Sequence, residues 1–258
     1  MAAWKRSVVF LILFGVAACT PGTRPEPVDE NVVRVGITPN APPLIFKQGS
    51  DIVGLEADFA REFAKFLGKS LRFVEVAWED QITALLRGRT DIIMSGMSVT
   101  ELRKVRIAFS NPYLRSGQMA LIRSEDVTLF RSGYFSLIKR ESIGVVKDTT
   151  GQFFVEQGLG YSKAKVVPYA TSREGVEALI DRRIDVFVHD APIVMYLASE
   201  NESRGVRPVF SLLTEEYLAW GIRKEDTALL EAANEFVSTL KNDGRLKSMA
   251  EQWIPFLK

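Results

Sequence analysis

The chain has 258 residues, of which 47% are hydrophobic and 25% charged, an ordinary composition for a globular protein of one or two domains. Its 33 basic and 32 acidic residues give a formal net charge of +1, and removing Lys5 and Arg6 with the N-terminal segment leaves 31 basic against 32 acidic residues. No basic stripe survives that subtraction, which argues against nucleic acid as a partner.

The N-terminus has the pattern of an export signal. A basic pair precedes an apolar stretch at residues 8–16 that is too short to span a membrane, so residues 1–18 are predicted to be a signal peptide. The sequence Val-Ala-Ala-Cys that ends at Cys19 resembles the lipobox of bacterial lipoproteins, which implies that Cys19 carries a lipid anchor. A plain secretory signal cleaved after Ala18 and an uncleaved anchor are the alternatives.

Residues 20–31 (TPGTRPEPVDEN) contain three prolines and no apolar period, which predicts a flexible tether. Cys19 is the only cysteine, so the exported chain has no internal disulfide, even in an oxidising compartment. Residues 19–31 are therefore expected to be a lipidated cysteine followed by a linker that keeps the folded part of the chain off a membrane.

From residue 32 the sequence alternates between strand-like and helix-like patterns. The order β-α-β-α-β calls for a parallel sheet with right-handed crossovers. Asp58 suits an N-terminal cap or the first turn of the first helix, and Gly68 suits its C-terminal stop. The predicted strands are 32–38, 71–77 and 92–94, and the predicted helices are 59–67 and 81–87.

The same order appears a second time along the chain. Residues 84–93 also align with residues 178–187 without a gap, which places His189 and Asp190 opposite Ser95 and Gly96. Similar local rules can produce short matches, but with the repeated order they favour two similar lobes, each aiming a strand end at a shared cleft. The predicted strands are 142–147, 164–170 and 184–188, and the predicted helices are 150–159, 173–183, 228–240 and 246–253.

Residues 91–113 (DIIMSGMSVTELRKVRIAFSNPY) combine a short buried strand, a loop of small residues and a helix start. Loops that leave the carboxyl end of a parallel strand bind ligands in open α/β sheets. Arg103 offers a planar fork of donors that matches a carboxylate, with the hydroxyls of Ser98 and Thr100 close by. From the residues alone, this is either an anion clamp or a solvated arginine paired with Glu101.

The same stretch resembles the signature of the family 3 extracellular solute-binding proteins, the polar amino acid receptors of bacterial ABC importers. The shared pattern is an Asp-led strand, a small-residue loop, Thr-x-x-Arg and then Phe-Ser-x-x-Tyr. The resemblance covers about residues 32–253. It implies an α/β, two-lobed type II periplasmic binding protein, in which each lobe is a mostly parallel sheet flanked by helices and two hinge crossings join the lobes. Lobe 1 is predicted to be residues 32–114 and 219–258, and lobe 2 residues 115–218.

In that family an arginine holds the α-carboxylate of a free amino acid and an aspartate holds its α-amino group. These roles map onto Arg103, helped by the loop backbone at Gly96 and by Ser98, and onto Asp190. A zwitterion needs a cation and an anion held a few ångströms apart, and a site that requires both lobes stabilises the closed form selectively. From the residues alone, Asp190 could equally cap a helix that begins at the following Ala-Pro.

The turn Asp-Thr-Thr-Gly at residues 148–151 resembles a Gly-Thr-Thr turn of the family, whose second threonine assists the carboxylate. That role maps onto Thr150, with Asp148 in place of the usual glycine. The departure adds a negative charge near the cleft and leaves the local backbone shape open. Asp148 or Thr149 as a helix cap is the alternative, and it does not exclude the binding role of Thr150.

The resemblance also implies where the rest of the substrate binds. Trp78 follows the second strand, where family members place an apolar or aromatic wall, although core packing is its alternative. Phe46 follows a nearby proline-rich loop, and Ala41 stands where several relatives carry a stacking aromatic. Thr38 occupies a position where receptors for basic amino acids often have an acidic residue, which argues against a lysine- or arginine-specific site.

Neither a metal, nor a cofactor, nor catalysis is expected. His189 is the only histidine and no serine lies in a Gly-x-Ser-x-Gly elbow. The prediction is a monomer in the periplasm or cell envelope, lipid-anchored to a membrane, which captures a free amino acid and delivers it to an ABC permease in the inner membrane. The alternatives are an enzyme on the same fold, such as a cyclohexadienyl (prephenate/arogenate) dehydratase with Glu56, Asp148 or His189 as general acid, or a sensory or accessory envelope lipoprotein.

Overall fold

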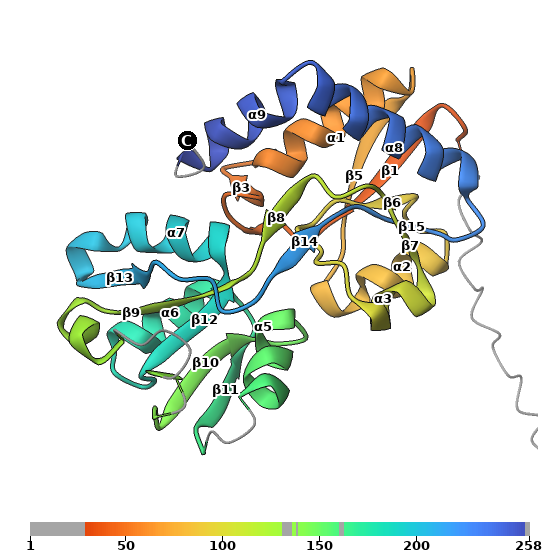
Figure 1. Cartoon of the computed structure of the whole chain (residues 1–258). Coiled ribbons are helices and arrows are strands. Elements are labelled where there is room, and N and C mark those ends of the chain that lie inside the picture. The colour runs from red at the N-terminus through yellow and green to blue at the C-terminus, as the bar shows by residue number, and fades with distance from the viewer. Residues whose placement is uncertain (1–28, 131–135, 138, 160–162, 256–258) are drawn as a thin grey trace, which may run out of the picture. The chain divides into compact units, whose positions relative to one another are not determined.

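Two five-stranded sheets organise the chain in the computed structural model (Figure 1). The structure describes residues 29–130, 136–137, 139–159 and 163–255. The predicted signal peptide, the lipidation site Cys19 and most of the predicted tether lie outside these residues. In the part of the chain that is described, no helix combines the length and the apolar character needed to cross a membrane.

The first sheet has the strand order β5-β1-β6-β15-β7. Strand β1, next to the edge, runs parallel to β5 on one side and to β6 on the other, as the β-α-β-α-β order predicts. The strand β15 arrives from the far end of the chain and pairs antiparallel with both β6 and β7. The strands are β1 (Val32–Ile37), β5 (Ser70–Glu75), β6 (Ile92–Ile93), β7 (Ala108–Phe109) and β15 (Gly221–Ile222).

The helices of this half of the fold confirm the predicted ones, with one shifted boundary. The first helix begins at Leu55 rather than at Phe59, because Gly54, with a φ of 118°, forms the N-cap in a conformation that suits glycine. Asp58 therefore lies in the first turn and is not the cap, and Gly68 (φ 65°) follows the helix end as predicted. The elements are α1 (Leu55–Phe66), a 3₁₀ turn η1 (Trp78–Asp80), α2 (Gln81–Leu86) and α3 (Glu101–Arg106).

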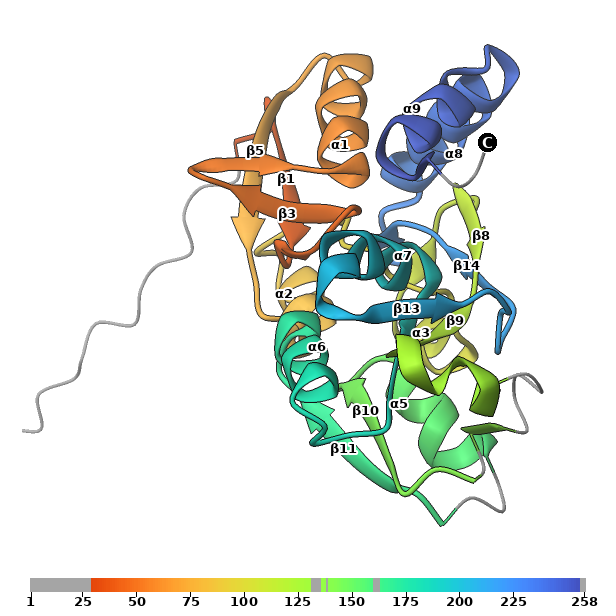
Figure 2. The same ribbon diagram turned by 90° about the vertical axis from the view of Figure 1, so that its left-hand side faces the viewer.

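The C-terminal helices belong to the same half of the fold. Helices α8 (Thr227–Asn242) and α9 (Arg245–Trp253) pack beside α1 (Figure 2). Phe236 of α8 lies with its ring 5.3 Å from that of Phe63 and 5.9 Å from that of Trp220. Burying each such side chain contributes roughly 1.5–3 kcal/mol, so this aromatic cluster ties the end of the chain to its beginning.

The second sheet repeats the layout of the first, with the order β11-β10-β12-β9-β13. Strand β10, next to the edge, is parallel to β11 and β12, and β9 is antiparallel to both β12 and β13. The topology thus confirms two similar halves. The strands are β9 (Gln118–Arg123), β10 (Ser142–Val146), β11 (Lys165–Tyr169), β12 (Val186–Asp190) and β13 (Val206–Val209).

The helices around the second sheet also agree with the prediction, except that the one expected at 150–159 is a single α-turn continued by a π-turn. Gly175 lets its helix approach the sheet, since a Cβ there would lie 2.1 Å from the Phe187 ring. The elements are η2 (Ser124–Phe130), α5 (Thr150–Phe153), the π-turn η3 (Phe154–Gly158), α6 (Ser172–Ile180), α7 (Ala191–Glu200) and η4 (Glu202–Arg204).

Two strands connect the sheets and pair with each other. Strand β8 (Leu114–Ser116) leads from the first sheet to the second, and β14 (Glu216–Leu218) leads back. They form an antiparallel ribbon in which Leu114 lies opposite Leu218 (Figures 1 and 2). The predicted lobe boundaries, 114/115 and 218/219, lie in or next to these two strands. A small hairpin sheet of β2 (Asn40–Ala41), β3 (Ile45–Gln48) and β4 (Asp51–Val53) precedes α1.

Candidate functional site

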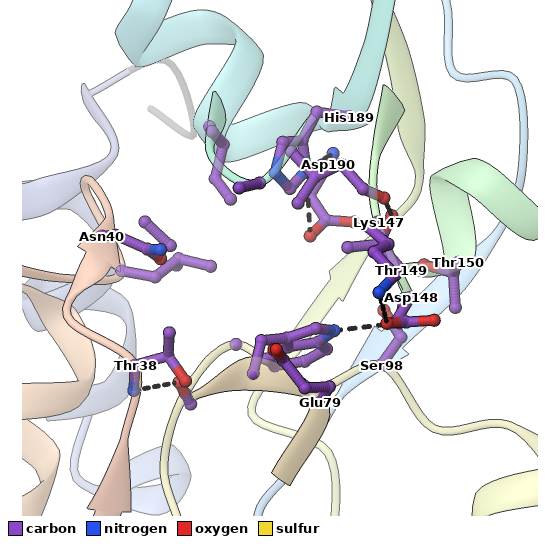
Figure 3. Close-up of a pocket in the computed structure, with 18 of the residues that line it drawn as sticks. Thr38, Asn40, Glu79, Ser98, Lys147, Asp148, Thr149, Thr150, His189 and Asp190 are labelled. Atoms are coloured by element: carbon purple, nitrogen blue, oxygen red, sulfur yellow. Dashed lines mark hydrogen bonds and ion pairs between the residues drawn. The ribbon is translucent and has the colours of Figure 1, made fainter. Parts of the chain in front are cut away.

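A cavity of about 250 Å³ lies where strands of the two sheets end. In the close-up, Thr38 and Asn40 lie on one side of it, Asp148, Thr149 and Thr150 lie on the other, and His189 and Asp190 lie above (Figure 3). The cavity is lined by Thr38, Asn40, Ala41, Leu44, Trp78, Glu79, Ser95, Gly96, Ser98, Arg103, Val146, Lys147, Asp148, Thr149, Thr150, Ala170, His189, Asp190 and Ile193.

Arg103 reaches the cavity from the first turn of α3. The Thr100 hydroxyl caps this helix by accepting from the backbone N–H of Arg103 at 3.2 Å, and the Arg103 Nη1 donates to the Ser98 carbonyl at 2.7 Å. Glu101 pairs with Lys104 at 2.8 Å, so the alternative of a solvated Arg103–Glu101 pair does not hold. Among the described residues, the Nε and Nη2 of Arg103 have no hydrogen-bond partner, which leaves the fork open to a carboxylate.

Two electrostatic effects change the pKa of Arg103 in opposite directions. Burial lowers the pKa of its guanidinium, and the nearby carboxylates of Asp190 and Glu216 offset this lowering only in part. The guanidinium carbon also lies 5.3 Å from the centre of the Trp78 ring, a cation–π arrangement. The cation is therefore largely desolvated and is held in place before any ligand contact.

Asp190 is the last residue of β12 and the residue before α7. Although it occupies the N-cap position, its side chain makes no capping hydrogen bond, so the capping alternative fails. Its Oδ1 accepts from the Nε2 of Gln118 at 2.5 Å, and its Oδ2 lies 3.6 Å from the Nδ1 of His189. That Nδ1 accepts from the backbone N–H of Asp190 at 2.7 Å.

The loop that follows β6 is held in place by hydrogen bonding to a buried carboxyl group. The backbone N–H of Gly96 (φ 68°) donates to the Oε2 of Glu56 at 3.0 Å, and the Tyr113 hydroxyl donates to the Oε1. Burial raises the pKa of Glu56 to about 7, against the opposing effect of these two hydrogen bonds. Ser98 is almost fully buried and lines the cavity. The N–H of Gly96 is already used, so Gly96 contributes through the shape of the loop.

Asp148 has a glycine-like backbone conformation, and it stands where the family usually has a glycine. It has a φ of 59°, in the left-handed region that glycine, asparagine and aspartate tolerate best. The backbone N–H of Asp148 donates to the Gln152 side chain at 2.7 Å, and the Thr149 hydroxyl caps α5. The Thr150 hydroxyl donates to the Oε2 of Glu216 at 2.8 Å.

The remaining predicted residues divide into two groups. Thr38, Ala41 and Trp78 line the cavity, and Trp78 also packs on a small cluster of buried side chains behind it. Phe46 is not among the cavity residues, because its ring packs 6.0 Å from that of Tyr196 and 5.9 Å from that of Trp253.

Two polar residues that the sequence reasoning missed connect the site to the crossing strands. Gln118, fully buried at the start of β9, places its Nε2 3.1 Å from the Thr150 hydroxyl and 3.1 Å from the Oε1 of Glu216. Glu216 begins β14 and also accepts from Thr214 at 2.8 Å. Their position at the predicted crossings was the one available signal, since neither lies in a recognisable motif.

The described residues hold no group of three or more His, Cys, Asp or Glu side chains arranged to bind a metal ion. A guanidinium, a carboxylate and several hydroxyls converge on the one cavity. Two α/β lobes, joined by a pair of crossing strands around such a cavity, define a type II periplasmic binding protein fold.

Comparison with known proteins gives the family. The family model described as bacterial extracellular solute-binding proteins, family 3, matches residues 33–256, and the chain belongs to this family. ABC transporter arginine-binding protein 1 of Escherichia coli (strain K12) is 24% identical over 228 residues, which are 86% of this chain and 90% of that protein.

Solved structures agree. An ancestral arginine-binding protein bound to arginine shares 28% identity with a TM-score of 0.80, over 86% of this chain and 98% of that one. The ancestral amino acid-binding protein AncCDT-1, a precursor of cyclohexadienyl dehydratase, shares 30% identity with a TM-score of 0.79, over 87% of this chain and 95% of that one. Each is a protein to which this chain is similar.

Proposed function

We propose that this protein binds a free α-amino acid, or a similar small zwitterion, between lobe 1 (32–114 and 219–258) and lobe 2 (115–218) and delivers it to an ABC permease. The observation that carries the proposal is the pairing of Arg103, with its open fork, and Asp190, with an oxygen that accepts no hydrogen bond among the described residues, on one cavity. Arg103 takes the carboxylate with help from Ser98, and Asp190 takes the amino group. Thr150 donates its one hydroxyl hydrogen to Glu216 and would have to turn to assist the carboxylate.

The cavity supports a single small ligand. A volume of about 250 Å³ suits one amino acid rather than a peptide. Trp78 forms the wall beside the ligand, and Ala41 leaves room opposite. The Thr38 hydroxyl donates to the Val76 carbonyl and accepts from Gln81, so it brings no charge to the ligand's side chain. Relatives named for arginine, histidine and cystine mark the range of side chains to be tested.

The cell envelope is the compartment that the family and the N-terminal sequence support. In this proposal the chain is exported, acylated at Cys19 and anchored to a membrane as a monomer, with residues 20–31 as its tether. Metabolic labelling of cells with a clickable palmitate analogue tests the anchor. The native chain is expected to be labelled and Cys19→Ala to remain unlabelled.

The function is tested by thermal-shift and calorimetric titration of the full chain with each of the 20 common L-amino acids. A ligand at a hundredfold excess over its Kd should stabilise the protein by roughly 2.7 kcal/mol. Arg103→Ala should weaken binding about 100-fold or more, because two charge-assisted bonds are lost. Arg106→Ala, an exposed arginine on the same helix, is the matched control and should bind like the native protein. No binding by any amino acid would refute the proposal.

A second candidate function is a dehydratase on the same fold. It is favoured by the likeness to a precursor of cyclohexadienyl dehydratase and by Asp148 and His189, two acid–base groups that line the cavity. Glu56 does not line it, because its carboxyl is buried against Tyr113 and Gly96. Incubating the protein with prephenate or arogenate, and measuring the remaining compound by chromatography, separates the two functions. A dehydratase consumes the compound, whereas a binding protein returns it unchanged.

A further inference from the structure

Among the described residues, one hydrogen bond joins the two predicted lobes away from the crossing strands. The indole Nε1 of Trp78 donates to the backbone carbonyl of Asp148 at 2.9 Å, across 70 residues of sequence (dashed at Asp148 in Figure 3). Trp78 opens η1, just after β5 of the first sheet, and Asp148 lies in the turn after β10 of the second. Both residues line the cavity, so this contact closes one side of it.

The accepting carbonyl is held by a turn with little freedom. Asp148 has a left-handed backbone, and its N–H is tied to the Gln152 side chain at 2.7 Å. Thr149, the next residue, caps α5. The Asp148 carboxylate is half-exposed and lies 3.8 Å from the Nζ of Lys147, so the indole meets the backbone and not the charge.

The same indole lies against Arg103, whose guanidinium carbon is 5.3 Å from the ring centre. One side chain thus contacts the cation of lobe 1 with its face and the turn of lobe 2 with its edge. The ring face and the N–H are chemically separable, because phenylalanine keeps a face and has no N–H donor.

We propose that Trp78 is a latch, a positioning residue whose N–H stabilises the closed arrangement of the lobes and slows the escape of bound ligand. The latch deepens the proposed function and rests on it for its biological purpose, although its effect on closure needs no ligand. A contact made only when the lobes meet stabilises the closed form by its own net free energy. For a neutral hydrogen bond this corresponds to about a two- to tenfold change in the closed-to-open ratio.

The test compares Trp78→Phe with Trp253→Phe in the full chain. The Nε1 of Trp253 donates to the Oδ2 of Asp58 at 2.8 Å, so the control also removes an indole hydrogen bond, here to a carboxylate and between two residues of lobe 1. Spin labels at Lys69→Cys and Glu202→Cys, two exposed positions in different lobes, report the distance distribution by double electron–electron resonance. Cys19→Ser removes the native thiol.

Without added ligand, Trp78→Phe is expected to shift the short-distance to long-distance ratio two- to tenfold toward the open form. Trp253→Phe is expected to lower the melting temperature and leave the ratio unchanged. An unchanged ratio in Trp78→Phe overturns the proposal. The proposal is also overturned if the native protein has no short-distance population, because the closed arrangement that the latch is proposed to stabilise would then be absent.

A second pair of variants tests the acceptor. Asp148→Gly keeps the left-handed turn and should keep the native ratio, whereas Asp148→Val disfavours the turn and should open the lobes as Trp78→Phe does. In the double variant Trp78→Phe with Asp148→Val, no further opening is expected, since both changes break one bond. Fully additive effects would overturn the latch.

The outcome is distinguishable from failure of the proposed function. If no amino acid binds but Trp78→Phe opens the lobes, the latch stands and the amino acid proposal falls. If an amino acid binds, its dissociation rate, measured by stopped-flow displacement, should rise two- to tenfold in Trp78→Phe with little change in association rate. An unchanged dissociation rate in Trp78→Phe overturns the latch and leaves the function intact.

Discussion

The two sheets share a strand order, yet they deliver their charges to the cavity in different ways. After β6 the chain runs through a loop before α3 begins, and the cation reaches back from the helix on the long side chain of Arg103. After β12 no loop intervenes, because α7 starts directly after Asp190, and the anion sits on a short side chain at the strand end. The long side chain lets the cation of Arg103 adjust its position, whereas the carboxylate of Asp190 is fixed close to the end of its strand.

The supports beneath the two charges differ as well. The loop of lobe 1 rests on the buried carboxyl of Glu56, which accepts from Gly96 and Tyr113. The strand end of lobe 2 rests on the uncharged amide of Gln118, which donates to Asp190 and to Glu216. Repeated topology therefore sets where a functional group can stand, while local residues decide its charge and how firmly it is held.

The largest expected effect concerns the support of lobe 1. Because the folded-state pKa of Glu56 is raised to about 7, the folded protein binds a proton there that the unfolded chain has released. The free energy of unfolding should therefore fall as pH rises from 4.5 to about 7, by on the order of 3 kcal/mol from this group. Urea unfolding at several pH values measures it.

Glu56→Gln is the matched variant for that measurement. Its amide accepts one hydrogen bond and does not titrate, so the difference in stability between native and variant should vary with pH over this range. A difference that stays constant between pH 4.5 and pH 7 would show that Glu56 titrates normally in the fold.

The next effect concerns the rigid charge of lobe 2. Asp190→Asn keeps an oxygen that can accept from Gln118 and removes the charge, so one charge-assisted bond to the ligand becomes a neutral one. Affinity for the best-binding amino acid is expected to fall roughly 10- to 150-fold, as isothermal calorimetry measures it. Asp181→Asn, an exposed residue after α6, should bind normally. Equal affinities in the two variants would contradict the role of Asp190.

A smaller effect is expected for the support beneath Asp190. Gln118→Met has a similar length and no donor, so it leaves Asp190 and Glu216 without the amide that links them. The free energy of unfolding should drop by on the order of 1 to 2 kcal/mol. Gln48→Met, on the exposed end of β3, is the control and should change little. A stable Gln118→Met protein would mean that water replaces the amide without cost.

The smallest effect sharpens the boundary of the site. Outside the cavity, Phe46 packs on Tyr196 of lobe 2 and on Trp253 of lobe 1, so Phe46→Leu should cost about 1 kcal/mol of stability. Because leucine keeps an apolar contact between the lobes, ligand affinity should change little. Trp78→Phe, by contrast, should alter ligand release with the ring still present. A loss of affinity in Phe46→Leu would show that Phe46 belongs to the binding site and that the site extends beyond the cavity.

The amino-acid sequence by itself determined the order of strands and helices, because hydrophobic period and turn residues are local properties. It also pointed to Arg103 and Asp190, since Asp190 follows one predicted strand and Arg103 follows the loop that leaves another, and the carboxyl ends of parallel strands meet at one edge. The resemblance of the residues around Arg103 to a family signature then implied that Arg103 binds the carboxylate of the ligand.

Only the tertiary structure decided how the site is supported and closed. Glu56 beneath Gly96, and Gln118 between Asp190 and Glu216, are contacts between residues 40 to 98 positions apart that belong to no motif. The exclusion of Phe46 from the cavity follows from packing against α7 and α9. The sequence sets local preferences, whereas contacts between distant residues depend on how the whole chain packs.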